Sequence, residues 1–102
     1  MEKREKLKEM VDYQQGSIVS KTVLDKAAGM MTLFAFDVGQ GLSEHTAPYD
    51  AMVYLVEGKA EITIGKEKSL LEEGDMIIMP SNIPHAVKAT EHFKMLLIMI
   101  KS

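Results

Sequence analysis

The histidines are the side chains of this sequence that offer the widest choice of chemistry. There are three, His45, His85 and His92, and the chain has no cysteine. An imidazole can ligate a metal ion or act as a general acid or base near neutral pH. The lack of cysteine excludes disulfides, thiolate zinc sites and cysteine nucleophiles. Because a histidine on an apolar strand is more often a core residue than a ligand, the residues around each histidine must decide its role.

Two stretches set His45 and His85 in a pattern. The first covers residues 39–58, GQGLSEHTAPYDAMVYLVEG, and the second covers residues 74–89, GDMIIMPSNIPHAVKA. The segment between them, 59–73, has 15 residues. The pair is similar to the two motifs of the cupin superfamily, which are a glycine, His-x-His, a glutamate and a glycine, then a glycine, Pro-x-Gly, a histidine and an asparagine. The resemblance implies a double-stranded β-helix, a small jelly-roll barrel.

The same resemblance implies a divalent metal inside the barrel, with zinc, iron, manganese and nickel as candidates. The family ligands are the two histidines and the glutamate of the first motif and the histidine of the second. This sequence has His45 and His85 at two of these positions but Ala47 and Ala51 at the others. A stable catalytic metal site usually has at least three protein ligands. We therefore expect His45 and His85 to lie in the pocket and a metal, if held by them, to be held weakly.

A replacement ligand would have to come from nearby residues. Period-two alternation points Glu44 and Asp50 away from the side of the strand that His45 would face. Two alternatives could still supply a ligand: the Tyr49-Asp50 segment could kink after Pro48, or Gln40 or Ser43 could turn inward.

The predicted pocket combines the motif residues with apolar neighbours. The chain contains nine methionines, which are flexible enough either to fill a core or to line a deformable apolar pocket for a small aromatic or partly apolar ligand. We expect His92, which lacks a motif partner, at the surface. The expected pocket residues are His45, Ala47, Ala51, Val53, His85, Gln40, Met31 and Met79.

Short strands with glycine and proline turns, at the spacing typical of an all-β sandwich or barrel, are expected to position these residues. Residues 16–101 are predicted to form the barrel of a single domain that covers residues 1–102. The predicted strands are 17–24, 30–38, 51–56, 59–64, 67–71, 76–79, 85–89 and 93–100.

A short amphipathic helix is predicted over residues 2–11, within an N-terminal segment 1–12, from the spacing of Leu7, Met10 and Val11. About ten residues are marginal for an isolated helix, so this segment must dock on something. It could cover one end of the barrel or contact a second subunit.

Charge and length exclude several classes of function. The net charge of −3 provides no basic surface for nucleic acid, and no apolar run approaches the roughly 20 residues of a membrane span. The first residues lack the apolar region of a secretory signal, which makes a cytoplasmic location the expectation.

Three functions agree with these features of the sequence. The first is a cupin that binds a small molecule inside the barrel. The resemblance also implies that such a protein is a homodimer. The second is a metal-dependent enzyme of the dioxygenase, isomerase or decarboxylase type, or one in which His45 or His85 acts as a general acid or base. The third is a structural module without a ligand. Fold resemblance alone does not choose among them.

Overall fold

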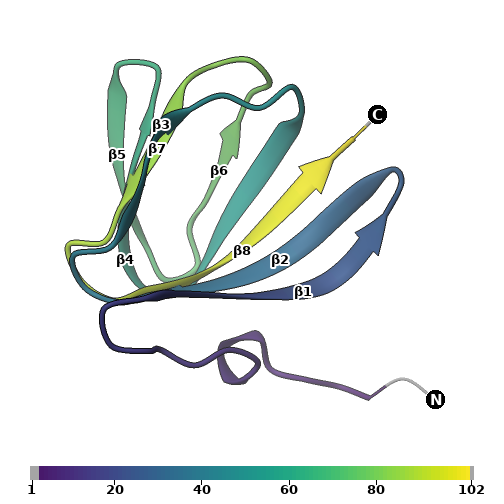
Figure 1. Ribbon diagram of the computed structural model, residues 1–102, viewed down its shortest axis with the longest axis vertical. Coiled ribbons are helices and arrows are strands. Elements are labelled where there is room, and N and C mark those ends of the chain that lie inside the picture. The colour runs from purple at the N-terminus through teal and green to yellow at the C-terminus, as the bar shows by residue number, and fades with distance from the viewer. Residues whose placement is uncertain (1–2, 102) are drawn as a thin grey trace.

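The computed structural model describes residues 3–101, and its strands form one strongly curled antiparallel sheet (Figure 1). This confirms the all-β barrel expected from the sequence. One helical turn precedes the strands. The elements are η1 (Leu7–Glu9), β1 (Ile18–Lys26), β2 (Gly29–Phe36), β3 (Gly41–His45), β4 (Asp50–Ile64), β5 (Glu67–Glu72), β6 (Met76–Met79), β7 (His85–Lys88) and β8 (Phe93–Ile100).

Strand β4 belongs to both walls of the barrel. Its first half pairs with β8 and β6, and its second half pairs with β5 and β7. The walls are therefore β1-β2-β8-β4-β6, called the five-stranded wall below, and β3-β7-β4-β5 (Figure 1). A bulge between Leu55 and Glu57 lets the strand turn from one wall into the other.

The expected break at Gly58 was wrong, because β4 runs without interruption from Asp50 to Ile64. Gly58 has φ +84° and still pairs with Phe93 across the sheet, so it bends the strand without ending it. Gly65 and Lys66 form the hairpin turn between β4 and β5, in the gap between the predicted strands 59–64 and 67–71.

The core lies between the two walls. Apolar side chains alternate along β4, where Ala51, Val53 and Leu55 are buried and point inward. Phe36 and Phe93 stack in this core with their ring centroids 4.5 Å apart. Such aromatic stacking adds roughly 0.5–1.5 kcal/mol to the burial of the rings.

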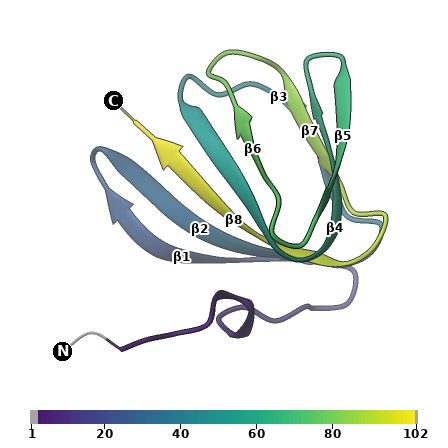
Figure 2. The same ribbon diagram turned by 180° about the vertical axis from the view of Figure 1, so that it is seen from behind.

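The N-terminal segment differs from the expectation. The helix predicted over residues 2–11 is reduced to the single 3-10 turn Leu7–Glu9, and the start of that prediction lies outside the described residues. Figure 2 shows the segment running along the outside of β1 and β2. Val11 packs there with Leu33 and Leu96 of the sheet. The segment thus covers an outer face of the sheet, and of the two alternatives left open by the sequence, a lid over the end of the barrel does not agree with this position.

Polar contacts attach this segment to the sheet. The Tyr13 hydroxyl donates a hydrogen bond of 2.7 Å to Glu57 Oε2, and Lys94 Nζ donates to the carbonyl oxygen of Lys8. Burial raises the pKa of Tyr13 above its ordinary value, and the bond to the Glu57 carboxylate and its charge raise it further. His92 is at the surface, as expected, where its ring stacks on Tyr13 with centroids 4.1 Å apart.

Within residues 3–101, no helix is long and apolar enough to cross a membrane. The cytoplasmic location stays a prediction.

Candidate functional site

The two motif histidines meet across a pair of strands. His45 ends β3 and His85 begins β7, and the two residues are direct partners in the antiparallel register. Direct partners place their side chains on the same face of a sheet, here the inner face. The Nε2 atoms lie 3.1 Å apart, and the rings cross at 70° with centroids 4.3 Å apart.

Backbone carbonyls orient both rings. His45 Nδ1 lies 2.7 Å from the carbonyl oxygen of Ser43, and His85 Nδ1 lies 3.3 Å from that of Ile83. Because a carbonyl oxygen only accepts, each Nδ1 must carry the proton. In two neutral rings, both Nε2 atoms would then present lone pairs to each other. This arrangement favours one shared electrophile between the rings, either a proton or a cation.

Burial distinguishes the two rings. His85 is 7% exposed, whereas His45 is at the surface of the barrel mouth. Burial lowers the pKa of His85, and the nearby His45 lowers it further, while the hydrogen bond with the Ile83 carbonyl acts in the opposite direction. His85 therefore favours its neutral form, in which Nε2 is an acceptor.

The pair opens onto an apolar cavity of about 180 Å³ between the two walls. On the side of the five-stranded wall, Ala51 pairs with Met79 of β6 and with Met99 of β8, and all three line the cavity. The polar side chains of the lining are His45, His85 and Tyr49. The complete lining is Phe34, Leu42, His45, Ala47, Tyr49, Ala51, Met79, His85, Val87, Met95, Leu97 and Met99.

Five of the eight expected pocket residues lie at this cavity: His45, Ala47, Ala51, Met79 and His85. The other three lie elsewhere, which corrects the expectation. Met31 points to the outer face, where it packs with the N-terminal cluster. Val53 points to the same side as Ala51 but is fully buried in the core. Gln40 precedes β3 at the end opposite to His45, where its carbonyl accepts from the Ala89 N–H.

Other lining residues were not assigned to the pocket from the sequence. Met95, Leu97 and Met99 alternate along β8, but this strand is apolar on both faces. Periodicity could therefore not tell which face is inside. Phe34, Leu42 and Val87 belong to strands for which only the pairing shows which side chains face the inside of the barrel.

The motif loops are joined by hydrogen bonds. Asp50 Oδ1 accepts from the Ser81 N–H at 2.8 Å, and the Ala47 carbonyl accepts from the Asn82 N–H at 2.8 Å. Asn82 has φ +63°, so asparagine does adopt the left-handed conformation that the family's glycine would take here. Asp50 points away from the histidines, as its place in the alternation predicts.

These residues do not fit a resident catalytic metal. Two imidazoles converge, but no group of three or more histidine, cysteine, aspartate or glutamate side chains with metal-binding geometry occurs within residues 3–101. The side chain of Ala47 and that of Ala51 provide no donor, and the Asp50 carboxylate is engaged by Ser81.

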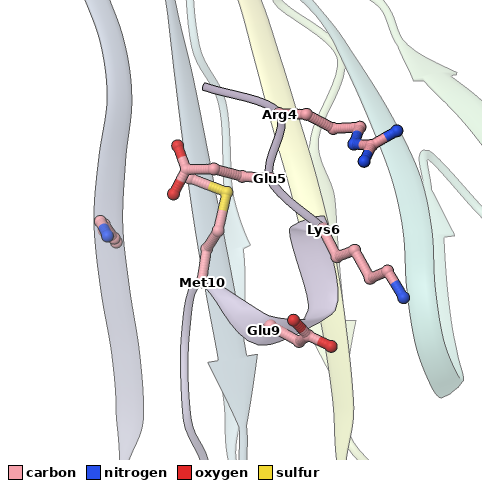
Figure 3. Close-up of a pocket in the computed structure, with 6 residues that line it drawn as sticks. Arg4, Glu5, Lys6, Glu9 and Met10 are labelled. Atoms are coloured by element: carbon pink, nitrogen blue, oxygen red, sulfur yellow. The ribbon is translucent and has the colours of Figure 1, made fainter. Parts of the chain in front are cut away.

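A larger hollow of about 440 Å³ lies outside the barrel, between residues 4–10 and β1. Its lining mixes Arg4, Lys6 and Lys21 with Glu5 and Glu9. In Figure 3 the side chains of Arg4 and Lys6 extend to the opposite side from those of Glu5 and Met10. These charged groups do not converge on one point, so the cavity inside the barrel is the candidate site.

Comparisons with known proteins agree with this fold. A conserved protein of unknown function from Streptococcus pyogenes is 40% identical, with a TM-score of 0.93 over 98% of this chain and 88% of that chain. A Cupin 2 conserved barrel domain protein from Leptotrichia buccalis is 41% identical, with a TM-score of 0.89 over 92% of this chain and 46% of that chain. Salicylate 1,2-dioxygenase from Pseudoaminobacter salicylatoxidans has a TM-score of 0.76 at 16% identity, over 81% of this chain and 26% of that chain, which shows a common fold alone.

No curated protein matches this chain at the sequence level. The cupin domain family matches residues 32–101, which include both histidines and most of the barrel. By this match and by its fold, the chain belongs to the cupin family.

Proposed function

We propose that this protein binds a small, largely apolar molecule inside the barrel. One polar group of the ligand donates a hydrogen bond to the imidazoles of His45 and His85. The observation that carries the proposal is the apolar cavity whose polar end is formed by two Nε2 atoms 3.1 Å apart. Such a pocket uses apolar contacts for affinity and a few polar groups for orientation.

The size of the cavity limits the ligand. An apolar cavity of about 150 Å³ admits benzene, and this one measures about 180 Å³. A single aromatic ring or a branched aliphatic chain of similar size therefore fits. Three methionines in the lining, Met79, Met95 and Met99, allow the wall to adapt to such shapes.

The test uses two probes that differ in one polar group, phenol and benzene, measured by calorimetric and NMR titration. We expect phenol to bind about tenfold more tightly than benzene, as one hydrogen bond of about 1.4 kcal/mol implies. His45→Leu and His85→Leu should each remove this preference. Ala51→Leu, which adds bulk at the cavity wall, should weaken the binding of both probes.

The matched control is His92→Leu, because His92 is a histidine outside the cavity. This variant should keep the preference for phenol. Equal affinity of the wild type for both probes, or an unchanged preference in both cavity variants, would contradict the proposed role of the histidine pair. If neither phenol nor benzene bound, the proposed function of the cavity would be contradicted.

A weakly held divalent metal is the second candidate. The observation in its favour is the convergence of the two Nε2 atoms, since one ion at about 2.0–2.1 Å from each nitrogen reaches both. Zinc, iron, manganese or nickel would then complete their coordination with water or ligand. The metal-dependent enzyme alternative rests on such an ion.

Metal analysis separates the two candidates. The untagged protein, purified without chelator, is compared with His45→Ala and His85→Ala by mass spectrometry of its metal content. Near-stoichiometric metal that both substitutions abolish would support the metal site. Metal far below stoichiometry, unchanged by the substitutions, would leave the apolar ligand as the function of the pair.

A further inference from the structure

Two methionines flank a small residue on the inner face of the five-stranded wall. Ala51 is the direct partner of Met79 on β6 and of Met99 on β8, so the three side chains point to the same face, and all three line the cavity. Methionine side chains are long and flexible, and both thioethers can reach the space above the alanine methyl group. Met95 also lines the cavity, but it lies four residues before Met99 on β8, roughly 13 Å deeper along the strand.

The histidine pair faces these methionines across the barrel. Residues 46–49 lead from His45, the last residue of β3, to the start of β4. Residues 80–84 lead from Met79, the last residue of β6, to His85, the first residue of β7. Both connections cross between the walls at the same end of the barrel (Figure 1). Two imidazoles and two thioethers therefore lie at the same end of one cavity.

The two imidazoles can share one small ion. Their Nε2 atoms lie 3.1 Å apart, and each Nδ1 donates its proton to a backbone carbonyl. With metal–nitrogen distances of about 2.0–2.1 Å, the angle between the two bonds would be roughly 100°. This value is close to a tetrahedral angle, so two coordination positions remain for other donors.

The donors and the charge of the cavity determine the class of ion. Among residues 3–101, no carboxylate lines the cavity, and its imidazole and thioether donors are neutral. The electrostatic cost of moving an ion from water into an apolar cavity rises with the square of its charge, so a monovalent ion costs far less than a divalent one. Thioether sulfur is a soft ligand that selects Cu(I), and imidazole also suits copper.

We propose that this end of the cavity binds one Cu(I) ion, held by both histidines and by the thioethers of Met79 and Met99. The site differs from that of a divalent metal, because sulfur completes the coordination in place of water or a carboxylate. Cu(I) and a phenol would compete for the same Nε2 atoms. The titrations with phenol and benzene are therefore made on metal-free protein, and the two proposals can fail independently.

The affinity is measured without oxygen, in the presence of ascorbate, by competition with the chromogenic Cu(I) chelator bicinchoninate. We expect one Cu(I) per chain. The double variant Met79→Leu/Met99→Leu should bind Cu(I) at least about tenfold more weakly, because leucine has a similar volume but no sulfur. His45→Leu should also weaken binding by at least about tenfold, since it removes one of the two nitrogen donors. Circular dichroism and the urea midpoint show whether each variant keeps the fold.

Met31→Leu is the matched control, because it makes the same exchange on the outer face of the same wall. This variant should bind Cu(I) like the wild type. X-ray absorption at the copper edge tests the proposal without any variant, since the wild-type complex should show both nitrogen and sulfur neighbours. Absence of stoichiometric Cu(I) binding, an unchanged affinity in the double methionine variant, or a copper ion without sulfur neighbours would overturn the proposal.

Discussion

At the scale of single residues, the two histidines are defined by what lies beside them. His45 and His85 direct Nδ1 to backbone carbonyls and Nε2 toward each other. The surrounding lining is apolar apart from Tyr49. A neutral pair therefore offers acceptors to a ligand that brings its own proton. Burial adds to this by favouring the neutral form of His85.

The lowered pKa of His85 makes stability depend on pH. The unfolded chain protonates this residue near its ordinary pKa of about 6.5, whereas the folded protein does so only at lower pH. The unfolded state thus binds more protons in this range, and the free energy of unfolding falls as the pH is lowered from about 7 to 5. In His85→Asn, the free energy of unfolding, measured by urea denaturation, should decrease less over this pH range than in the wild type.

His92→Asn provides the control for this measurement, because it removes a histidine that lies at the surface. The free energy of unfolding of this variant should fall more between about pH 7 and pH 5 than that of His85→Asn, because the buried His85 is retained. The same slope in all three proteins would show that burial of His85 does not contribute.

At the scale of elements, the bend of β4 joins the five-stranded wall to the wall β3-β7-β4-β5, which carries His45 and His85. The strand changes walls next to Gly58, whose backbone lies close to β8. A Cβ atom at Gly58 would lie 2.2 Å from the carbonyl oxygen of His92 and 2.9 Å from Cα of Phe93. Both neighbours are backbone atoms at the start of β8, so they cannot move aside without disturbing the pairing of β8 with β4.

Two glycine substitutions separate this close approach from the cost of the backbone conformation. Gly16 has φ +67° and no atom within 4 Å of the position of a Cβ. Gly16→Ala should cost about 1–2 kcal/mol, the cost of the left-handed conformation alone. Gly58→Ala should cost at least about 3 kcal/mol, because overpacking adds to it. Denaturant unfolding measures both, and equal losses would show that the β8 backbone yields.

At the scale of the whole molecule, the N-terminal segment provides a second layer over part of the barrel. Its attachment combines the apolar contact of Val11 with the group Tyr13, Glu57 and Lys94. Lys94 Nζ lies 3.9 Å from Glu57 and 5.0 Å from the centroid of the Tyr13 ring. This group joins the segment to β4 and β8.

Tyr13→Phe should destabilise the protein by about 1 kcal/mol, because it removes the hydrogen bond to the partly exposed Glu57 carboxylate. The control is Tyr49→Phe, which removes the same atom from a residue whose hydroxyl has no hydrogen bond within residues 3–101. Its effect should stay within about 0.5 kcal/mol. Equal effects in thermal and urea unfolding would mean that the bond to Glu57 does not stabilise the segment.

Much of the barrel could be predicted because its strands have local signals. The limits of β6 and β8 agree with the apolar runs at 76–79 and 93–100, and the Gly65-Lys66 turn joins the strands as expected. The strand at Gly41–His45 was recognised only as part of a motif, since glycine and polar residues dominate it. The 3-10 turn at Leu7–Glu9 replaced a predicted helix because docking on the sheet, and not helix propensity, determines its conformation.

By itself, the sequence determined the family, the barrel and the place of His45 and His85 in a pocket. It also determined that alanine occupies the other ligand positions of the family. These features depend only on residue types and on their spacing along the chain. Only the tertiary structure decided that the two Nε2 atoms converge, that Met95 and Met99 face the cavity, and that Met31 faces outward. The reason is that β2, β4 and β8 are apolar on both faces, so alternation alone cannot identify the inner side. The register with neighbouring strands does so.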